Sequence, residues 1–344
     1  MKKSNSNRSM RNYLDWNLCD RALAEAQIDI QESKGERPRL LKQLAESHCR
    51  QLPIVNQDDI DKLQVLHQDY PNMSSVIDEI EGQMHLQSMM GAPLKIPPLL
   101  LLGPAGVGKT AFGYALAAEL DMSFEYRSFA DVTASFVLTG TSTVWSSGRP
   151  GIVADLCLNA KSQTAPLIFI DEIDKAGMHA HRPDNALLSL LEPRSSRAFI
   201  DEYLGIPLDV SPVSWVLAAN NLAQVRPEII SRMRVIHVSC PTQTQMPKIV
   251  SSVDRQLRQQ YPGFDNYIAP LCSASVARLT SQPVREIKKL LEGLYVEIAR
   301  QRFSGIRQIT PELVDRVIER SRPRRSAGIS EHPPFTLSPP PSIQ

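Results

Sequence analysis

A glycine-rich segment that ends in a lysine and a threonine is the part of this sequence whose residue types most directly predict chemistry. The segment reads Gly103-Pro104-Ala105-Gly106-Val107-Gly108-Lys109-Thr110. Glycines let backbone N–H groups converge on phosphate oxygens, and a helix that begins here adds the positive end of its dipole. We expect Lys109 to contact the β- and γ-phosphates and Thr110 to give a hydroxyl ligand to Mg²⁺. The segment therefore predicts a site for ATP with Mg²⁺.

Two carboxylates follow a second apolar run, at residues 167–170. That run predicts a buried strand, which delivers Asp171 and Glu172 to its carboxyl end, where ligands bind in open α/β sheets. We expect Asp171 to hold Mg²⁺ through water and Glu172 to polarise the water that attacks the γ-phosphate. The alternative is a solvated acidic loop. The strand behind the pair and its place about sixty residues after the glycine-rich segment favour the catalytic interpretation.

The elements that must position these residues are predicted by the periodicity of the chain. Short β-rich runs alternate with helical stretches between residue 99 and about residue 237, the order of a parallel sheet with helices on both faces. We predict an α/β fold with a P-loop NTPase sheet, followed by a smaller all-helical domain. The expected boundaries are a helical or irregular lead-in at 1–70, the nucleotide-binding domain at 71–240, the helical domain at 241–321 and a disordered, proline-rich tail at 322–344.

Composition narrows the class of protein. The chain has 344 residues, 42% of them hydrophobic, and no apolar run approaches the roughly 18 residues that cross a bilayer. The five cysteines lack CxxC spacing, which favours reduced thiols over a disulfide framework or a zinc site. The formal net charge of +1 gives no global attraction to nucleic acid or to an anionic membrane. We therefore expect a soluble, cytoplasmic protein that has no membrane partner, and we disfavour a nucleic-acid partner.

Four segments together resemble the ATPase module of Lon proteases. The resemblance extends from about residue 70 to about residue 320. They are the segments 103–110, 168–175, 186–193 and 203–211. The resemblance implies an AAA+ α/β domain with a helical lid, a homo-oligomeric hexameric ring, and ATP at each subunit interface. In that family a Ser-Lys peptidase domain follows the lid. Only the short segment 322–344 follows it here, so we expect an ATPase that is not a peptidase by itself.

The resemblance also assigns roles to individual residues. Asn220 resembles the sensor-1 asparagine that reads the γ-phosphate, its alternative being an ordinary residue at a strand end. Arg232 resembles the arginine finger that reaches a neighbour's ATP, and Arg234 and Arg226 are rival candidates. Family sequences usually carry an acidic residue where Arg234 stands, so the identity of the finger stays open. Arg285 resembles the sensor-2 arginine of the lid, its alternative being a surface salt bridge.

A tryptophan in a segment rich in Ser, Thr and Gly, 140–152, resembles the aromatic residue of the first pore loop of Lon. Trp145 could hold an unfolded chain through the large apolar surface of its ring rather than through specific hydrogen bonds. The alternative is a buried core tryptophan. His179 and His181 have no acidic or cysteine partner at a clear spacing, so we expect a surface loop there rather than a metal site.

The function expected from these features is an ATP-hydrolysing, protein-remodelling or unfolding motor that acts on a protein substrate through Trp145. The first alternative is a nucleotide-switched module that controls assembly with a partner protein. A DNA-associated AAA+ loader is a third possibility, and only the basic cluster at 320–325 supports it.

Overall fold

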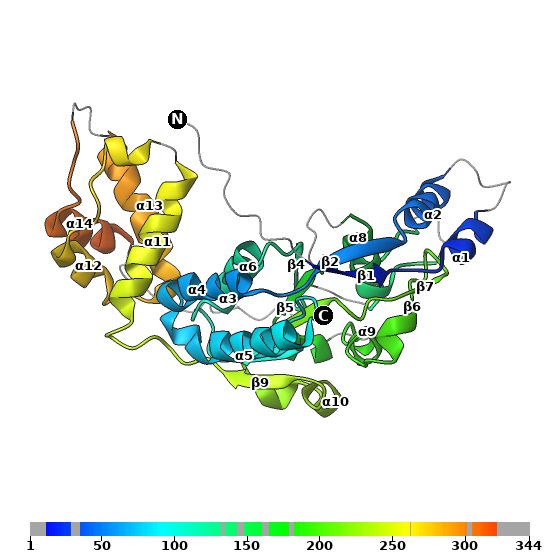
Figure 1. Cartoon of the computed structure of the whole chain (residues 1–344). Helices are drawn as coiled ribbons and strands as arrows, with labels where there is room; N and C mark the ends of the chain where they lie inside the picture. The colour runs from blue at the N-terminus through cyan, green and yellow to red at the C-terminus, as the bar shows by residue number, and fades with distance from the viewer. Residues whose placement is uncertain are drawn as a thin grey trace, which may run out of the picture.

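Five parallel strands form the central sheet of the protein, in the spatial order β4-β5-β8-β3-β9 (Figure 1). The computed structural model describes residues 12–28, 35–131, 135–142, 148–159, 165–178, 182–261, 263–300 and 305–321. The sheet strands are β3 (Leu99–Leu102), β4 (Phe124–Ser128), β5 (Leu167–Asp171), β8 (Ser214–Ala219) and β9 (Arg234–His237). Each strand pairs in parallel with its neighbours, which confirms the α/β class predicted from the sequence.

The central strands are buried on both faces, because their alternate side chains enter two different hydrophobic clusters. Leu99 and Leu101 of β3 belong to one cluster, and Leu100 and Leu102 belong to the other. Successive side chains of a strand point to opposite faces of a sheet, so a run of four leucines fills both sides at once. This arrangement explains why the strands read as continuous apolar runs in the sequence.

Helices cover both faces of the sheet. One face carries α3 (Gln57–Asp61), α4 (Leu63–Asp69), α5 (Ser74–Met90) and α6 (Lys109–Glu119). The other carries α7 (Phe136–Thr139), α8 (Ile152–Asn159), α9 (Asn185–Leu190) and α10 (Pro227–Ile230). The connections include two short strands, β6 (Phe199–Ile200) and β7 (Pro207–Leu208), and the 3-10 helices η2 (Pro71–Met73), η3 (Ile173–Met178), η4 (Ser195–Ala198), η5 (Leu222–Gln224) and η6 (Phe264–Asn266).

The N-terminal segment differs from the helical or irregular lead-in that the sequence suggested. Strands β1 (Tyr13–Asn17) and β2 (Cys49–Pro53) pair antiparallel around α1 (Arg21–Ala26) and α2 (Glu36–Glu46). Most of the side chains of β1 and β2 are exposed or half-buried, so the alternation of apolar and polar residues that indicates a strand in a sequence is weak here. Trp16 nevertheless packs in the core of the α/β body, and its Nε1 donates to the Asp209 carbonyl at 2.9 Å. This segment is therefore packed onto the body.

Four helices with a hydrophobic cluster of their own form the lid, seen as the yellow to orange lobe at one end of Figure 1. They are α11 (Met246–Gln260), α12 (Ser273–Leu279), α13 (Val284–Arg300) and α14 (Pro311–Ser321). Helix α11 packs against α4 of the body, and Arg255 of α11 pairs with the Asp69 carboxylate. Within the described part of the chain, no helix is long and apolar enough to span a bilayer.

Candidate nucleotide-binding site

The glycine-rich segment joins the end of β3 to the start of α6, as the sequence predicted. Gly108 has a φ of 99°, a left-handed conformation that glycine adopts without the strain of a side chain. Gly103 is fixed by close packing, because a Cβ built on it would lie 2.1 Å from the Val238 carbonyl oxygen. Helix α6 begins at Lys109, immediately after Gly108. The loop therefore presents the amino end of a helix to whatever occupies the cleft beside it.

Lys109 is almost fully buried and is surrounded by oxygen atoms. Its Nζ donates to the carbonyls of Gly103 and Pro104, at 2.6 and 3.0 Å, and to Asn220 Oδ1 at 2.9 Å. Burial lowers the pKa of Lys109, and the nearby carboxylate of Asp171 opposes that shift most strongly. A buried ammonium group with three neutral acceptors is suited to meet an anionic ligand in the cleft.

Asp171 and Thr110 meet although they are 61 residues apart in the sequence. Thr110 Oγ1 donates a hydrogen bond to Asp171 Oδ2, which joins the start of α6 to the end of β5. A hydroxyl and a carboxylate are hard oxygen ligands of the kind that Mg²⁺ prefers, and Mg²⁺ retains several of its own waters beside them. The two residues therefore fit the magnesium site that the sequence suggested.

Glu172 follows Asp171 at the carboxyl edge of the sheet. Its φ of 54° lies in the left-handed region, where a residue other than glycine costs on the order of 1 kcal/mol. Ser128 Oγ, at the end of neighbouring β4, donates to Glu172 Oε2 at 3.0 Å. Both features fix the carboxylate in one orientation at the edge of the cleft. The sequence predicted Glu172 but gave no sign of Ser128.

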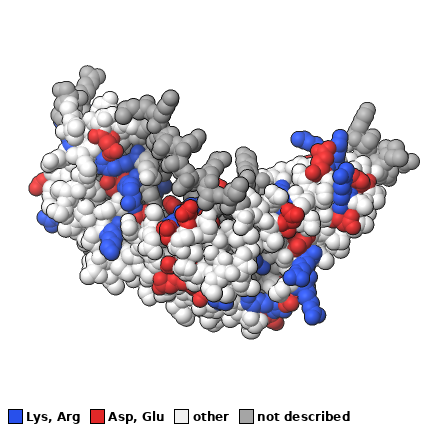
Figure 2. All heavy atoms as spheres, viewed as in Figure 1, with Lys and Arg blue, Asp and Glu red and all other residues white. Residues whose placement is uncertain are grey.

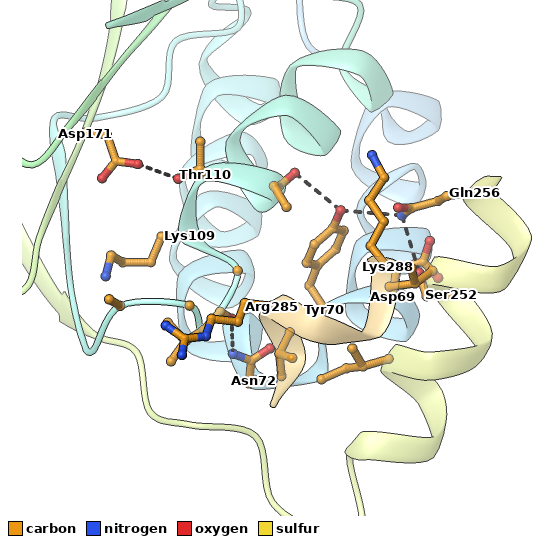
Figure 3. Close-up of a pocket in the computed structure, with 18 of the residues that line it drawn as sticks. Asp69, Tyr70, Asn72, Lys109, Thr110, Asp171, Ser252, Gln256, Arg285 and Lys288 are labelled. Carbon is orange, nitrogen blue, oxygen red and sulfur yellow. Dashed lines mark hydrogen bonds between the residues drawn. The ribbon is translucent and has the colours of Figure 1, made fainter. Parts of the chain in front are cut away.

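A cleft of about 550 Å³ joins these residues and lies between the body and the lid (Figure 3). In Figure 3, Lys109, Thr110 and Asp171 line one side, and Tyr70, Gln256 and Lys288 line the other. The predicted site residues in its wall are Ala105, Gly106, Val107, Gly108, Lys109, Thr110, Asp171, Glu172, Asn220 and Arg285. The structure thus brings most of the predicted nucleotide site into one cavity.

Two predicted sensor residues occupy defined positions in this cleft. Asn220 lies at the end of β8, and buried Asp174 accepts its backbone N–H at 3.3 Å, which anchors the asparagine. Arg285 lies in the first turn of α13, and a Cβ built on Gly106 would lie 3.4 Å from its Cδ. The lid arginine therefore extends over the glycine-rich loop. Its guanidinium is largely exposed and lies 3.6 Å from Glu286, which is the surface salt bridge that the sequence offered as the alternative.

Sequence reasoning missed the residues at the far side of the cleft. Tyr70 packs its ring edge against Phe112 with centroids 5.7 Å apart, and it accepts a hydrogen bond from Gln256 of the lid at 3.4 Å. Asn72 donates to the Val107 carbonyl at 3.0 Å, and so ties η2 to the glycine-rich loop. Single polar residues such as these follow no spacing rule, so no local signal identified them.

The three arginine-finger candidates lie outside the cleft. Arg232 Nη1 donates to the Glu228 carbonyl at 2.5 Å, and Arg232 Nε lies 3.7 Å from Glu192 Oε2. Arg234 pairs with Glu79 of α5, and Arg226 pairs with residues of the α9 and α10 region. None of the three lines the cavity of its own chain. Contact with a nucleotide would therefore require the cleft of another subunit.

The predicted pore-loop residue Trp145 lies outside the described residues, as do His179 and His181. The two sides of the Trp145 segment are joined by hydrogen bonds between described residues. The Thr141 N–H donates to the Arg149 carbonyl at 3.0 Å, and the Arg149 N–H donates to Thr141 Oγ1 at 3.0 Å.

Comparison with known proteins agrees with this geometry. Residues 99–240 match the family model described as "ATPase family associated with various cellular activities (AAA)". A Lon protease of Chloroflexus aggregans is 27% identical over 73% of this chain and 31% of its own length. The mitochondrial Lon protease homolog of Kluyveromyces lactis is 30% identical over 68% of this chain and 22% of its own length. The chain thus spans about a fifth to a third of the length of these curated relatives.

A solved structure titled as a closed-state reconstruction of Hsp104 with ATPγS and casein has the same fold. It aligns with a TM-score of 0.52 and 16% sequence identity, over 77% of this chain and 46% of the other. At this identity the likeness concerns the arrangement of the elements alone.

Proposed function

We propose that this chain, an AAA+ ATPase module that resembles the one in Lon proteases, binds ATP in the cleft between body and lid and hydrolyses it. The observation that supports this most is the convergence of Lys109, Thr110, Asp171 and Asn220 on one cavity beneath Arg285 of the lid. We take 71–240 as the nucleotide-binding domain and 241–321 as the lid, since each region contributes one wall of the cleft.

The chain's own residues perform two tasks in the proposed reaction. Lys109 and the N–H groups of the glycine-rich loop bind the phosphates and exchange their internal partners for phosphate oxygens. Glu172, held by Ser128, accepts a hydrogen bond from the attacking water and aligns it with the γ-phosphate, while Asn220 helps to orient that water. Mg²⁺ at Thr110 and Asp171 would neutralise charge on the β- and γ-phosphates.

We further propose that the subunits form a ring in which Arg232 acts on the ATP of a neighbour. The guanidinium is held away from its own cleft by Glu228 and Glu192. A fixed positive charge supplied from a neighbour stabilises the transition-state oxygens and can be worth ~10³ to 10⁵ in rate. A hexamer is the ring that the resemblance to Lon suggests.

We propose that ATP hydrolysis drives the unfolding or remodelling of a protein substrate, which Trp145 contacts and holds. The test is Trp145→Ala, assayed for ATP hydrolysis and for ATP-dependent unfolding of a fluorescent protein that carries an unstructured tail. The expected result is near-normal ATPase activity with unfolding abolished. Lys109→Ala is the matched negative control, because it should abolish nucleotide binding and both activities.

Two outcomes of this test separate the alternatives. An unchanged rate of substrate unfolding in Trp145→Ala would show that Trp145 does not hold the substrate. A wild-type protein that hydrolyses ATP and unfolds no substrate, but associates with a partner protein only in the ATP state, would instead support a nucleotide-switched assembly module.

A further inference from the structure

A histidine and two carboxylates on the surface of α4 and α5 form a compact cluster outside the nucleotide cleft. His67 lies in the last turn of α4, and Asp78 and Glu81 lie on α5. One ligand atom from each of the three falls within 4.8 Å of the others. His67 Nε2 is 3.6 Å from Asp78 Oδ1 and 3.5 Å from Glu81 Oε2.

The cluster is held by the packing of the two helices that carry it. Asp78 and Glu81 are three residues apart on α5, so they occupy the same face of that helix. Helix α4 packs against α5, and Leu66, next to His67, belongs to the same hydrophobic cluster as Ile77, next to Asp78. The core beneath therefore fixes the two helix backbones that carry the imidazole and both carboxylates.

The distances are suited to ligands that share a metal ion. The 3.5 and 3.6 Å distances lie within the roughly 4 Å of an ion pair with a protonated histidine, and they exceed the roughly 2.7–3.2 Å of a direct N–H···O hydrogen bond. Zinc binds imidazole nitrogen and carboxylate oxygen at about 2.0–2.2 Å, and tetrahedral angles then separate neighbouring ligand atoms by about 3.3–3.5 Å. His67 thus lies at nearly the separation from each carboxylate that a common ion requires.

The charges of the cluster favour a cation as well. Two like charges three residues apart on a helix repel each other, and a divalent ion between them offsets that repulsion. His85, one turn further along α5, lies 3.9 Å from the other oxygen of Glu81, which places a second imidazole beside the cluster. Imidazole is a poor ligand for Mg²⁺ and a good one for zinc, so this donor set differs in kind from Thr110 and Asp171.

We propose that His67, Asp78 and Glu81 bind a divalent transition-metal ion, with Zn²⁺ as the best chemical match and water in the fourth position. The ion would join the last turn of α4 to α5. That turn leads directly into Asp69 and Tyr70, which line the nucleotide cleft, so metal binding would also stiffen this wall.

The test is a titration of the metal-free full-length protein with Co²⁺, in saturating Mg²⁺ and without nucleotide. Tetrahedral Co²⁺ absorbs visible light far more strongly than the hydrated ion, so binding is read directly from the spectrum. Wild-type protein is expected to bind one Co²⁺ in this form and to release it to Zn²⁺. His67→Gln and Asp78→Asn should each weaken the affinity at least ten-fold.

The matched control is Asp58→Asn, which removes an exposed carboxylate from α3 and should leave the affinity unchanged. Circular dichroism of each variant verifies folding, and because the Asp78 side chain is 66% exposed, its amide variant should fold normally. Equal affinity in wild type, His67→Gln and Asp78→Asn would overturn the proposal. Failure of the wild type to bind Co²⁺ below millimolar concentration would overturn it too. Neither result depends on ATP hydrolysis, so the proposed ATPase is tested separately.

Discussion

At the scale of single residues, the candidate catalytic carboxylate is positioned by neighbours that are distant in sequence. Ser128 of β4 donates to Glu172, which follows β5, and their residue numbers differ by 44. Parallel strands end at the same edge of a sheet, so the side chains at the ends of β4, β5 and β8 converge there. The position of this candidate glutamate could be predicted from its local context, but the serine that donates to it became visible only in the folded protein.

Glu172→Gln should bind ATP normally and hydrolyse it ~10²–10⁴ times more slowly, because an amide cannot accept a proton from water. Steady-state ATPase rates and binding of a fluorescent ATP analogue measure the two properties separately. The control is Glu46→Gln, which replaces an exposed carboxylate of α2 with an amide and should retain full activity. Rapid turnover by the Glu172 variant would contradict the assignment of Glu172 as the base.

A second residue-scale feature is the buried carboxylate of Asp201. Its oxygens accept backbone N–H groups of Tyr203, Leu204 and Gly151, at 3.0, 3.1 and 2.8 Å. Burial raises the pKa of Asp201 to about 6, although these hydrogen bonds oppose the shift. Asp201 thus joins the chain before β7 to the start of α8.

The raised pKa predicts the pH dependence of stability. The native state holds the Asp201 proton up to a higher pH than the unfolded chain does, so this group's contribution to stability declines as pH rises from about 4 to about 6. Asp201→Asn removes that titration. The free energy of unfolding, measured with urea, should decrease between pH 4.5 and pH 7 by about 2 kcal/mol more in the wild type than in the variant. Parallel changes in both proteins would refute the shifted pKa.

At the scale of elements, two helix glycines have opposite surroundings. A Cβ built on Gly113 of α6 would lie 2.4 Å from a ring carbon of Phe169, which is fully buried in β5. A Cβ built on Gly82 of α5 meets nothing within 4 Å. Gly113 therefore permits α6 to approach the sheet closely, and so sets the position of the helix that begins at Lys109.

Gly113→Ala and Gly82→Ala should change stability in opposite directions. The first forces a methyl group into a packed ring and should cost about 1–3 kcal/mol. The second reduces the freedom of the unfolded chain and should stabilise the protein by about 0.5–1 kcal/mol. Urea denaturation of the two variants measures both effects, and a neutral Gly113→Ala would show that α6 is not in close contact with β5.

At the scale of the whole molecule, the nucleotide cleft belongs to no single domain. Its walls include the end of α4 and η2, the glycine-rich loop, the carboxyl ends of β5 and β8, and two lid helices, α11 and α13. The molecule is extended, with α1 and α2 at one end and the lid at the other (Figure 1). Basic and acidic side chains are interspersed on the face shown in Figure 2, in keeping with the net charge of +1.

Mixing experiments test whether Arg232 acts between subunits. Arg232→Ala should bind ATP and lose at least ~10²-fold in hydrolysis rate, because the transition-state charge is no longer stabilised. Mixed with Glu172→Gln protein, it should regain activity at sites where an intact Glu172 faces a neighbour's intact Arg232. Steady-state ATPase assays across mixing ratios measure this recovery. Arg234→Ala is the matched comparison, because Arg234 is the rival candidate and pairs with Glu79. Loss of activity in Arg234→Ala but not in Arg232→Ala would assign the finger to Arg234. Activity that falls simply in proportion to dilution would argue against action between subunits.

The sequence by itself determined the features that depend on contiguous residues. A glycine-rich turn between an apolar strand and a helix specifies its own backbone, so residues 103–110 and the pair Asp171 and Glu172 could be placed before the structure was known. Only the tertiary structure decided which distant side chains complete the site, such as Tyr70 and Gln256, and that β1 and β2 pair within the N-terminal segment. Those contacts arise when the lid and the N-terminal segment pack on the body. Local periodicity carries no information about such long-range packing.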